Sequence, residues 1–383
     1  MAMRDITVAP LAGLTVVEAG NSVAAAFSTR LLLQLGATVL RLRAADPAGP
    51  GSTAAERDRA RAEEVFLGDG KQVEHVDAAQ AYAAADLIVR GADGAPDTSG
   101  PDPEAHYGSL RADNPALVYV YLSPFGLPVA PQQPAWRGDD AQAQAVGGLS
   151  SLVGRPDREP LVVPYDVVAS SQGLNAACAA LGALLSVQAG QHGSFIDIAA
   201  ADVAASYSRM YTLLYRFYGI APVRAGRRAP GSGGRYPMTI LPCRDGDVVL
   251  IGRSRRDWER YIAMMGRPAW SQDPRYQDPL GIAMEYPHEV DALIRPWLAE
   301  RTRAELGELA QQYGVPLGSV RTVGEVLEDP QMRFRRFFRS PATGTQTDSA
   351  GQDRPVVLPG FPAVFRRSAS DPHRSESFQP EGR

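Results

Sequence analysis

The chain has 383 residues, with 39 Lys and Arg against 43 Asp and Glu, so its formal net charge is only −4. This balance excludes the strongly basic surface that nucleic-acid binding requires. No apolar run reaches eighteen residues and no charged-then-apolar leader opens the chain, so we expect neither a membrane span nor a secretory signal. The two cysteines, Cys178 and Cys243, give no disulfide framework and no metal-site spacing, which predicts a soluble cytoplasmic protein without a metal.

The N-terminal residues predict a strand, a helix and a second strand in close succession. The apolar run at residues 11–17 (LAGLTVV) suits a strand, residues 24–35 an amphipathic helix, and residues 38–42 (TVLRL) another strand. Such a βαβ unit predicts a parallel sheet with its ligand at the carboxyl ends of the strands. No G-x-G-x-x-G follows the first strand, which removes the best support for a nicotinamide cofactor.

Two arginines, Arg41 and Arg43, close the second of these strands. A guanidinium group there could hold the phosphate of a nucleotide-like ligand, and a solvated strand end is the other interpretation. Residues 46–61 are rich in Pro, Gly, Ala and charge, so we expect a surface loop. Further strands are expected at residues 86–89 and within residues 114–126, and the loop that ends the latter should face the ligand crevice.

The central stretch, residues 164–202, predicts a loop, a long helix of small residues, a Gly-rich turn and a strand at residues 194–198. So many Ala and Gly residues suit a helix that packs closely against a sheet, so we expect it to be buried. Its predicted apolar face repeats every three or four residues and consists of Leu174, Ala177, Cys178, Leu181, Leu184 and Leu185.

Polar residues precede this helix, namely Asp166, Ser170, Ser171 and Gln172. A helix N-terminus concentrates backbone N–H donors and a partial positive charge, which favours anions and developing oxyanions. A functional role at this place and a plain N-cap by Asp166 or Ser170 are both consistent with the sequence, because Ser and Asp dominate N-caps.

A second unit is expected after a flexible connection. Residues 221–235 (APVRAGRRAPGSGGR) are too polar and Gly-rich for a core element and predict a linker. The remaining pattern predicts an α+β unit: a hairpin with an Asp-Gly turn at Asp245, three amphipathic helices, and a C-cap at Gly314. The strands are expected at residues 236–242 and 247–252, and the helices at residues 256–265, 287–301 and 303–313.

Several motifs along the chain resemble those of the family III CoA-transferases of the CaiB/BaiF and formyl-CoA transferase type, the group that includes the alpha-methylacyl-CoA racemases. They include NPALVYVYLSPFG at residues 114–126, DAQAQAVGGL at residues 140–149, GVPLGSV at residues 314–320 and EVLEDPQ at residues 325–331. The resemblance runs from about residue 10 to residue 365. It implies an α/β fold with a Rossmann-like large domain, a small α+β domain and an interlocked dimer.

On this basis we expect a large CoA-binding α/β domain at residues 1–220 and a Gly/Arg-rich linker or lid at residues 221–235. A small α+β domain should follow at residues 236–325, and residues 326–366 should return to the large domain. The polar tail, residues 367–383, is expected to be disordered.

The resemblance also implies site residues. Aligned without gaps, the family's catalytic aspartate, which carries the acyl group as a mixed anhydride, falls on Ala169, and the histidine of the racemases falls on Asp139. Alanine cannot form an anhydride. Asp166 lies three residues upstream, up to about 10 Å of extended chain, and is the candidate for a displaced nucleophile. The implied CoA-binding residues are Arg41, Arg43, Lys71 and the lid glycines Gly231, Gly233 and Gly234.

We therefore interpret the chain as a family III-like protein that acts on acyl-CoA, as an atypical or non-nucleophilic subunit beside an aspartate-bearing paralogue. One alternative is an active acyl-CoA:carboxylate CoA-transferase that uses Asp166. The others are a non-enzymatic binding or scaffold homologue and an alpha-methylacyl-CoA racemase. In each case we expect no permanently bound cofactor, coenzyme A thioesters and carboxylic acids as substrates, and assembly as a homodimer or heteromer.

Overall fold

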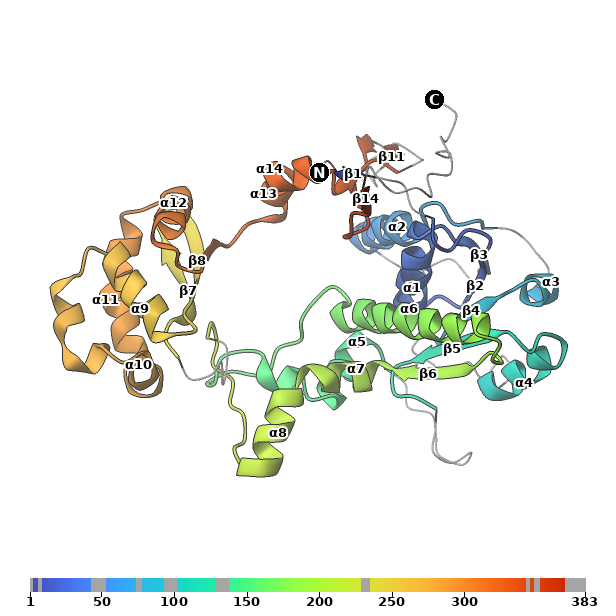
Figure 1. The fold of residues 1–383 in the computed structure, drawn as a ribbon, viewed down its shortest axis with the longest axis horizontal. Coiled ribbons are helices and arrows are strands. Elements are labelled where there is room, and N and C mark those ends of the chain that lie inside the picture. Colours follow the sequence, from blue (N-terminus) through green and yellow to red (C-terminus); the bar gives the residue numbers. More distant parts are fainter. Residues whose placement is uncertain are drawn as a thin grey trace. The chain divides into compact units, whose positions relative to one another are not determined.

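The computed structural model describes residues 3–5, 9–42, 53–73, 78–92, 102–127, 138–228, 235–341, 345–347 and 352–368. The chain divides into two compact units, and Figure 1 labels most of their elements. The first unit consists of Met1–Ala143, Tyr165–Val203 and Pro330–Arg383, and the second of Gln144–Pro164 and Ala204–Asp329. The chain therefore leaves the first unit twice and returns to it twice.

A parallel five-stranded sheet forms the centre of the first unit, in the order β3-β2-β4-β5-β6. Within this sheet the chain forms β2 first, then β3 on one side of β2, and then β4 on its other side. The carboxyl ends of β2 and β4 therefore flank the point where the strand order reverses, which is where ligands bind in such sheets. The strands are β2 (Thr15–Ala19), β3 (Thr38–Leu42), β4 (Leu87–Gly91), β5 (Val118–Ser123) and β6 (Phe195–Ala199).

Helices cover both faces of this sheet, because alternate residues of each buried strand point to opposite sides. On one face α1 (Val23–Gln34) and α6 (Val167–Gln188) pack over Val16, Val89 and Val120. On the other face α3 (Ala78–Ala83) and α4 (Pro103–Asp113) pack over strand residues that include Ile88 and Tyr119. The expected α/β fold with a parallel sheet is confirmed.

The helices α1 and α6 lie side by side, as Figure 1 shows. They approach each other closely at Gly173, where a Cβ atom would lie 2.5 Å from the carbonyl oxygen of Ala24. The residues of α6 that are buried are mostly small: Val168, Gln172, Gly173, Ala176, Ala177 and Ala180.

The predicted apolar face of α6 is therefore wrong in part. Leu174 and Leu185 are 51% and 66% exposed in the single chain, and Cys178 is exposed as well. Close packing against α1 selects the stripe of Ala and Gly, which turns the larger side chains outward. In the described part of the chain, α6 is also the one helix that is long and apolar enough to cross a membrane, with a third of its apolar window buried.

Most strand and helix positions in the first unit agree with the sequence analysis. Two predictions are corrected. Residues 11–13 form turns, and the first strand of the five-stranded sheet is Thr15–Ala19. The expected loop at residues 46–61 contains the start of α2 (Ala54–Gly68), because Thr53 and Glu56 form a capping box that the composition argument overlooked.

Apart from β1, the remaining elements of the first unit come from the C-terminal part of the chain. Arg339 Nη2 lies 2.7 Å from Asp69 Oδ2, and Arg30 Nη2 donates to the carbonyl oxygen of Pro359 at 3.0 Å, so this segment is joined to the sheet domain. Arg367 and Ser368, expected in a disordered tail, pair with β1 as part of β14; residues 369–383 lie outside the described residues. The elements are α14 (Pro330–Phe334) and the antiparallel pairs β1 (Met3–Asp5) with β14 (Arg366–Ser368), β10 (Phe338–Arg339) with β13 (Leu358–Pro359), and β11 (Thr345–Thr347) with β12 (Asp353–Pro355).

The second unit contains the predicted hairpin and helices. Strands β7 (Met238–Cys243) and β8 (Gly246–Ile251) pair around Arg244 and Asp245, and β9 (Leu317–Ser319) extends the sheet. Trp258, Tyr261 and Leu250 lie in its core, and Gly314 ends α12 at φ 63°, as expected. The helices are α8 (Arg209–Tyr218), α9 (Arg255–Met264), α10 (Pro279–Glu285), α11 (Pro287–Ala299), α12 (Arg303–Tyr313) and α13 (Val323–Leu327); α5 (Asp140–Val146) and α7 (Ala200–Tyr207) span the boundaries between the units.

Candidate functional site

A pocket of about 220 Å³ opens at the carboxyl edge of the parallel sheet, and all of its described lining belongs to the first unit. It lies at the reversal point of the strand order, between the segment that follows β2 and the ends of β4 and β5. Close backbone packing brings these segments together, since a Cβ atom on Gly91 would lie 2.1 Å from Ser22 Cβ. The lining residues are Asn21, Ser22, Val23, Ala92, Leu122, Ser123, Pro124, Gly138, Asp139, Asp140, Asp166, Ala169, Gln172 and Ala200.

Asp166 stands at the entrance of α6 in a strained conformation. Both Tyr165 and Asp166 have positive φ, 66° and 51°, which is unfavourable for residues other than glycine and is typical of functional sites. The backbone oxygen of Asp166 accepts from Ser170 N at 2.8 Å, but its side chain makes no capping bond. The carboxylate instead lines the pocket and lies 3.3 Å from Arg59 Nη2. Asp166 therefore occupies the N-cap position without acting as a side-chain cap.

Ala169 lies in the first turn of α6 and contributes to the pocket wall. Its backbone N–H donates to Asp140 Oδ1 at 2.7 Å, which ties the start of α6 to the start of α5. The structure thus brings the carboxylate of Asp140 next to the residue at which the family resemblance expects the catalytic aspartate. The sequence analysis did not single out Asp140, although it begins the DAQAQAVGGL motif.

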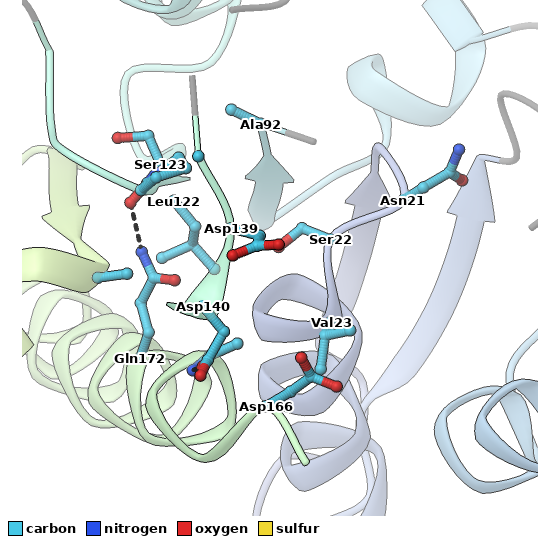
Figure 2. Close-up of a pocket in the computed structure, with 14 residues that line it drawn as sticks. Asn21, Ser22, Val23, Ala92, Leu122, Ser123, Asp139, Asp140, Asp166 and Gln172 are labelled. Atoms are coloured by element: carbon cyan, nitrogen blue, oxygen red, sulfur yellow. Dashed lines mark hydrogen bonds between the residues drawn. The ribbon is translucent and has the colours of Figure 1, made fainter. Parts of the chain in front are cut away.

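Asp139 is the third carboxylate of the pocket. Its Oδ1 accepts from the backbone N–H of Ala141 at 2.8 Å, and its own N–H donates to Gln142 Oε1 at 2.9 Å, so the start of α5 is well defined. In Figure 2 the three carboxylates lie between Ser123 and Gln172 on one side and the start of α1 on the other. Of the described residues that line the pocket, none is a lysine, arginine or histidine.

Gln172 links elements of the pocket through hydrogen bonds of its side chain. Its side chain is buried, and Nε2 donates to the carbonyl oxygens of Ser123 at 2.9 Å and Ile198 at 2.7 Å, the first of which is drawn in Figure 2. It therefore joins α6 to β5 and β6. Ser123 Oγ accepts from Gly126 N at 2.9 Å, and Ser123 and Pro124 line the pocket, so the expected loop after β5 does face it.

The predicted cations Arg41 and Lys71 do not line the pocket. Lys71 Nζ is buried and lies 2.6 Å from Glu18 Oε2 and 2.7 Å from the carbonyl oxygen of Ala26. Arg41 Nε lies 2.8 Å from Glu18 Oε1, and its Nη1 donates to Glu64 Oε1 at 2.9 Å. The structure therefore brings the two predicted cations together around one buried carboxylate. Arg43 and the glycines Gly231, Gly233 and Gly234 lie outside the described residues.

Glu18 is the residue that sequence reasoning missed. It is fully buried in β2, and Thr29 Oγ1 of α1 donates to its carboxylate as well. The available signal was a single acid within the apolar run LTVVEA. Lys71 is the only lysine of the sequence, and burial lowers its pKa to about 8 although the charge of Glu18 opposes this shift. This cluster joins β2, β3 and α1 through their side chains.

The arrangement limits the chemistry that the described lining can perform. Carboxylates can attack an activated acyl group as nucleophiles or move a proton. The described residues contain no group of three or more His, Cys, Asp or Glu side chains arranged to hold a metal ion. A pocket at a helix N-terminus with carboxylates on its wall suits acyl chemistry.

Comparisons with known proteins agree with this chemistry. Residues 11–376 match the model of CoA-transferase family III. The succinyl-CoA–D-citramalate CoA-transferase of Chloroflexus aurantiacus is 28% identical over 342 residues, which cover 85% of this chain and 82% of that protein. Subunit BbsE of the succinyl-CoA:(R)-benzylsuccinate CoA-transferase of Thauera aromatica is 26% identical over 271 residues, 68% of this chain and 62% of that subunit.

The fold has a solved counterpart as well. The crystal structure of a CAIB/BAIF family protein from Brucella suis matches with a TM-score of 0.75 and 25% identity, and the match covers 94% of this chain and 93% of that one. The family model thus spans nearly the whole chain, and the fold matches a solved structure over the same extent. The chain therefore belongs to CoA-transferase family III.

Proposed function

We propose that this protein binds an acyl-CoA with the acyl group in the pocket beside α6 and acts as the non-nucleophilic subunit of a heteromeric CoA-transferase. Its family uses CoA thioesters as substrates. The observation that carries the proposal is Ala169, whose side chain lies in the pocket wall where the resemblance expects a catalytic aspartate. A methyl group cannot attack a thioester, so the anhydride would form on an aspartate of an associated chain. The relative BbsE, which is named as a subunit, supports this interpretation.

The test is a CoA-transfer assay with three samples: this chain alone, an aspartate-bearing paralogue alone, and the two chains co-purified. Acetyl-CoA serves as donor with a panel of carboxylic acids as acceptors. We expect no transfer by this chain alone and faster transfer by the pair than by the paralogue alone. Transfer by this chain alone would contradict the non-nucleophilic role.

A second candidate function follows from Asp166. Its carboxylate lines the same pocket, its backbone is strained, and its ion pair with Arg59 is weak because the Arg59 side chain is 65% exposed. Asp166 would attack the thioester carbonyl and expel the CoA thiolate, which would then attack the aspartyl carbonyl of the resulting anhydride and release the donor acid. The acceptor carboxylate would attack this aspartyl thioester and expel the thiolate again, and the thiolate would take the acceptor acyl group from the second anhydride and free Asp166. This candidate predicts that the chain transfers CoA alone and that Asp166→Asn abolishes the transfer. Transfer that survives this substitution would exclude it.

The proposed CoA contacts need their own test. We propose that Arg41, Arg43 and Lys71 meet the CoA phosphates and that Gly231, Gly233 and Gly234 belong to a lid, as the resemblance implies. For Arg41 and Lys71 this requires an exchange of Glu18 for phosphate, because both are paired with Glu18. Isothermal titration with CoA should show weaker binding by Arg43→Ala, and unchanged binding would remove Arg43 from the site.

We further propose that the chain works in the cytoplasm as part of a dimer, either with itself or with the paralogue. The helix α8 supports this proposal, because the described chain leaves its aromatic side chains uncovered: Phe217 and Tyr218 are 74% and 75% exposed. Exposed apolar surface of this extent often marks an interface. Light scattering of the purified chain, and of the chain co-expressed with the paralogue, tests the assembly.

A further inference from the structure

We infer that the acyl group accepted by this pocket carries no carboxylate of its own: the pocket selects neutral monocarboxylic acyl groups over dicarboxylic ones. The inference rests on the proposed binding of acyl-CoA and narrows its substrate class.

The first ground is the charge of the lining. Asp139, Asp140 and Asp166 all border the pocket, and none of the other described lining residues carries a charge. Hydrogen bonds from backbone N–H groups hold the Asp139 and Asp140 carboxylates in place, from Ala141 at 2.8 Å and from Ala169 at 2.7 Å. These carboxylates are therefore fixed features of the wall.

The second ground is the weak compensation of this charge at the entrance. Arg59 pairs with Asp166 at 3.3 Å, but the side chain of Arg59 is largely exposed and is therefore screened by solvent. Another acid, the half-buried Glu63, lies near the same pair. Burial raises the pKa of Glu63, and the charge of Asp166 raises it further while Arg59 opposes this. The negative potential thus extends from the pocket to its rim.

The free carboxylate of a dicarboxylic acyl group would lie in this negative potential. At separations of several ångströms, a partly buried pair of like charges disfavours binding by roughly tenfold or more per pair. A terminal methyl group does not experience this repulsion and can contact the apolar lining residues Val23, Leu122 and Ala200. A hydroxyl group on the acyl chain could donate to the carboxylates. The acyl group expected here therefore differs from the dicarboxylic succinyl group that appears in the names of two relatives.

The experiment compares pentanoyl-CoA and glutaryl-CoA. Both have five-carbon acyl chains, but the pentanoyl chain ends in a methyl group and the glutaryl chain in a carboxylate. Isothermal titration of the full chain should give at least about tenfold tighter binding of pentanoyl-CoA at low ionic strength, and added salt should reduce this ratio. Asp140→Asn and the double variant with Asp139→Asn should reduce the ratio stepwise. Asparagine retains the carbonyl oxygen that accepts the backbone N–H group, so both variants should fold, which thermal unfolding verifies.

The matched control is Asp157→Asn, which removes one carboxylate from an exposed position outside the pocket lining. It should leave the ratio unchanged. Equal or tighter binding of glutaryl-CoA by the wild-type chain, or the same ratio in Asp140→Asn and Asp157→Asn, would overturn the inference while leaving CoA binding intact. If neither acyl-CoA nor free CoA binds, the proposed function itself fails, so the two failures are distinguishable.

Discussion

Asp166 and Ala169 lie one turn apart at the start of α6, and both border the pocket. They differ in what each can do to a thioester, because the carboxylate is a nucleophile and the methyl group is not. The structure adds Asp140, whose carboxylate accepts the N–H group of Ala169. At the residue scale the candidate site therefore consists of three aspartate carboxylates that line the same pocket as Ala169, which has no carboxylate.

The buried ammonium group of Lys71 predicts how the free energy of unfolding depends on pH. Its pKa is lowered from 10.5 to about 8 in the folded chain, chiefly by burial. The unfolded chain therefore holds this proton more tightly, and the contribution of Lys71 to the free energy of unfolding should increase between about pH 8 and pH 10.5 by up to about 3 kcal/mol. Urea unfolding of wild type and Lys71→Met across this range measures the difference.

Because Lys71 is the only lysine, selective ¹⁵N-lysine labelling gives one side-chain signal that reports its titration directly. A midpoint near 8 is expected. A midpoint at the ordinary value of 10.5, with parallel unfolding profiles of wild type and variant, would contradict the burial of this ammonium group.

At the scale of elements, the contact of α1 with α6 depends on Gly173. A methyl group there would approach the carbonyl oxygen of Ala24 to 2.5 Å, so Gly173→Ala should destabilise the protein by about 1–3 kcal/mol through overpacking. Gly182 lies in the same helix with nothing within 4 Å of its added Cβ. Gly182→Ala should therefore be neutral or stabilising by up to about 1 kcal/mol. Urea denaturation of both variants tests the pair, and equal effects would refute the close contact.

In the second unit a single carboxylate joins two segments to α11. Asp291 accepts from Tyr236 Oη at 2.8 Å and from Arg228, and it is buried. Asp291→Ala would leave a largely buried guanidinium group without its counter-charge, so we expect a loss of about 3 kcal/mol of stability. Asp291→Asn, which retains an acceptor for the tyrosine, should lose less. If alanine and asparagine have equal, small effects in thermal unfolding, the cluster is not stabilising.

Sequence patterns predicted the strands β3, β4, β5 and β6 and the helices α1 and α6, because the regular spacing of apolar residues and the continuous apolar runs mark these elements directly. They placed the wrong residues of α6 in the core, since the choice between Leu174 and Ala176 depends on the neighbouring helix rather than on α6 itself. They likewise missed Glu18, because its partners Lys71 and Arg41 come from other segments of the chain. Asp166 was found from its place before the helix and Ala169 from the family resemblance, whereas the contact of Ala169 with Asp140 requires the fold.

At the scale of the whole molecule, the chain alternates between its two units and contributes helices α5 and α7 at the boundaries. The family model covers this entire arrangement, which explains why the fold was predictable from scattered motifs. The interlocked dimer remains a prediction. If it forms, dimerisation should cover the aromatic face of α8, and Phe217→Ser should shift the assembly toward the monomer in light scattering without unfolding a helix that the single chain leaves exposed.

The central claim, that this chain lacks the acyl-accepting nucleophile, is tested most directly by intact-mass spectrometry after incubation with acetyl-CoA. The account predicts no covalent adduct on the wild-type chain. It predicts an acetyl adduct, discharged by hydroxylamine, on Ala169→Asp, because the new carboxylate would occupy the pocket wall. An acetyl adduct of the wild-type chain that maps to Asp166, or to any other carboxylate of the pocket, would contradict it.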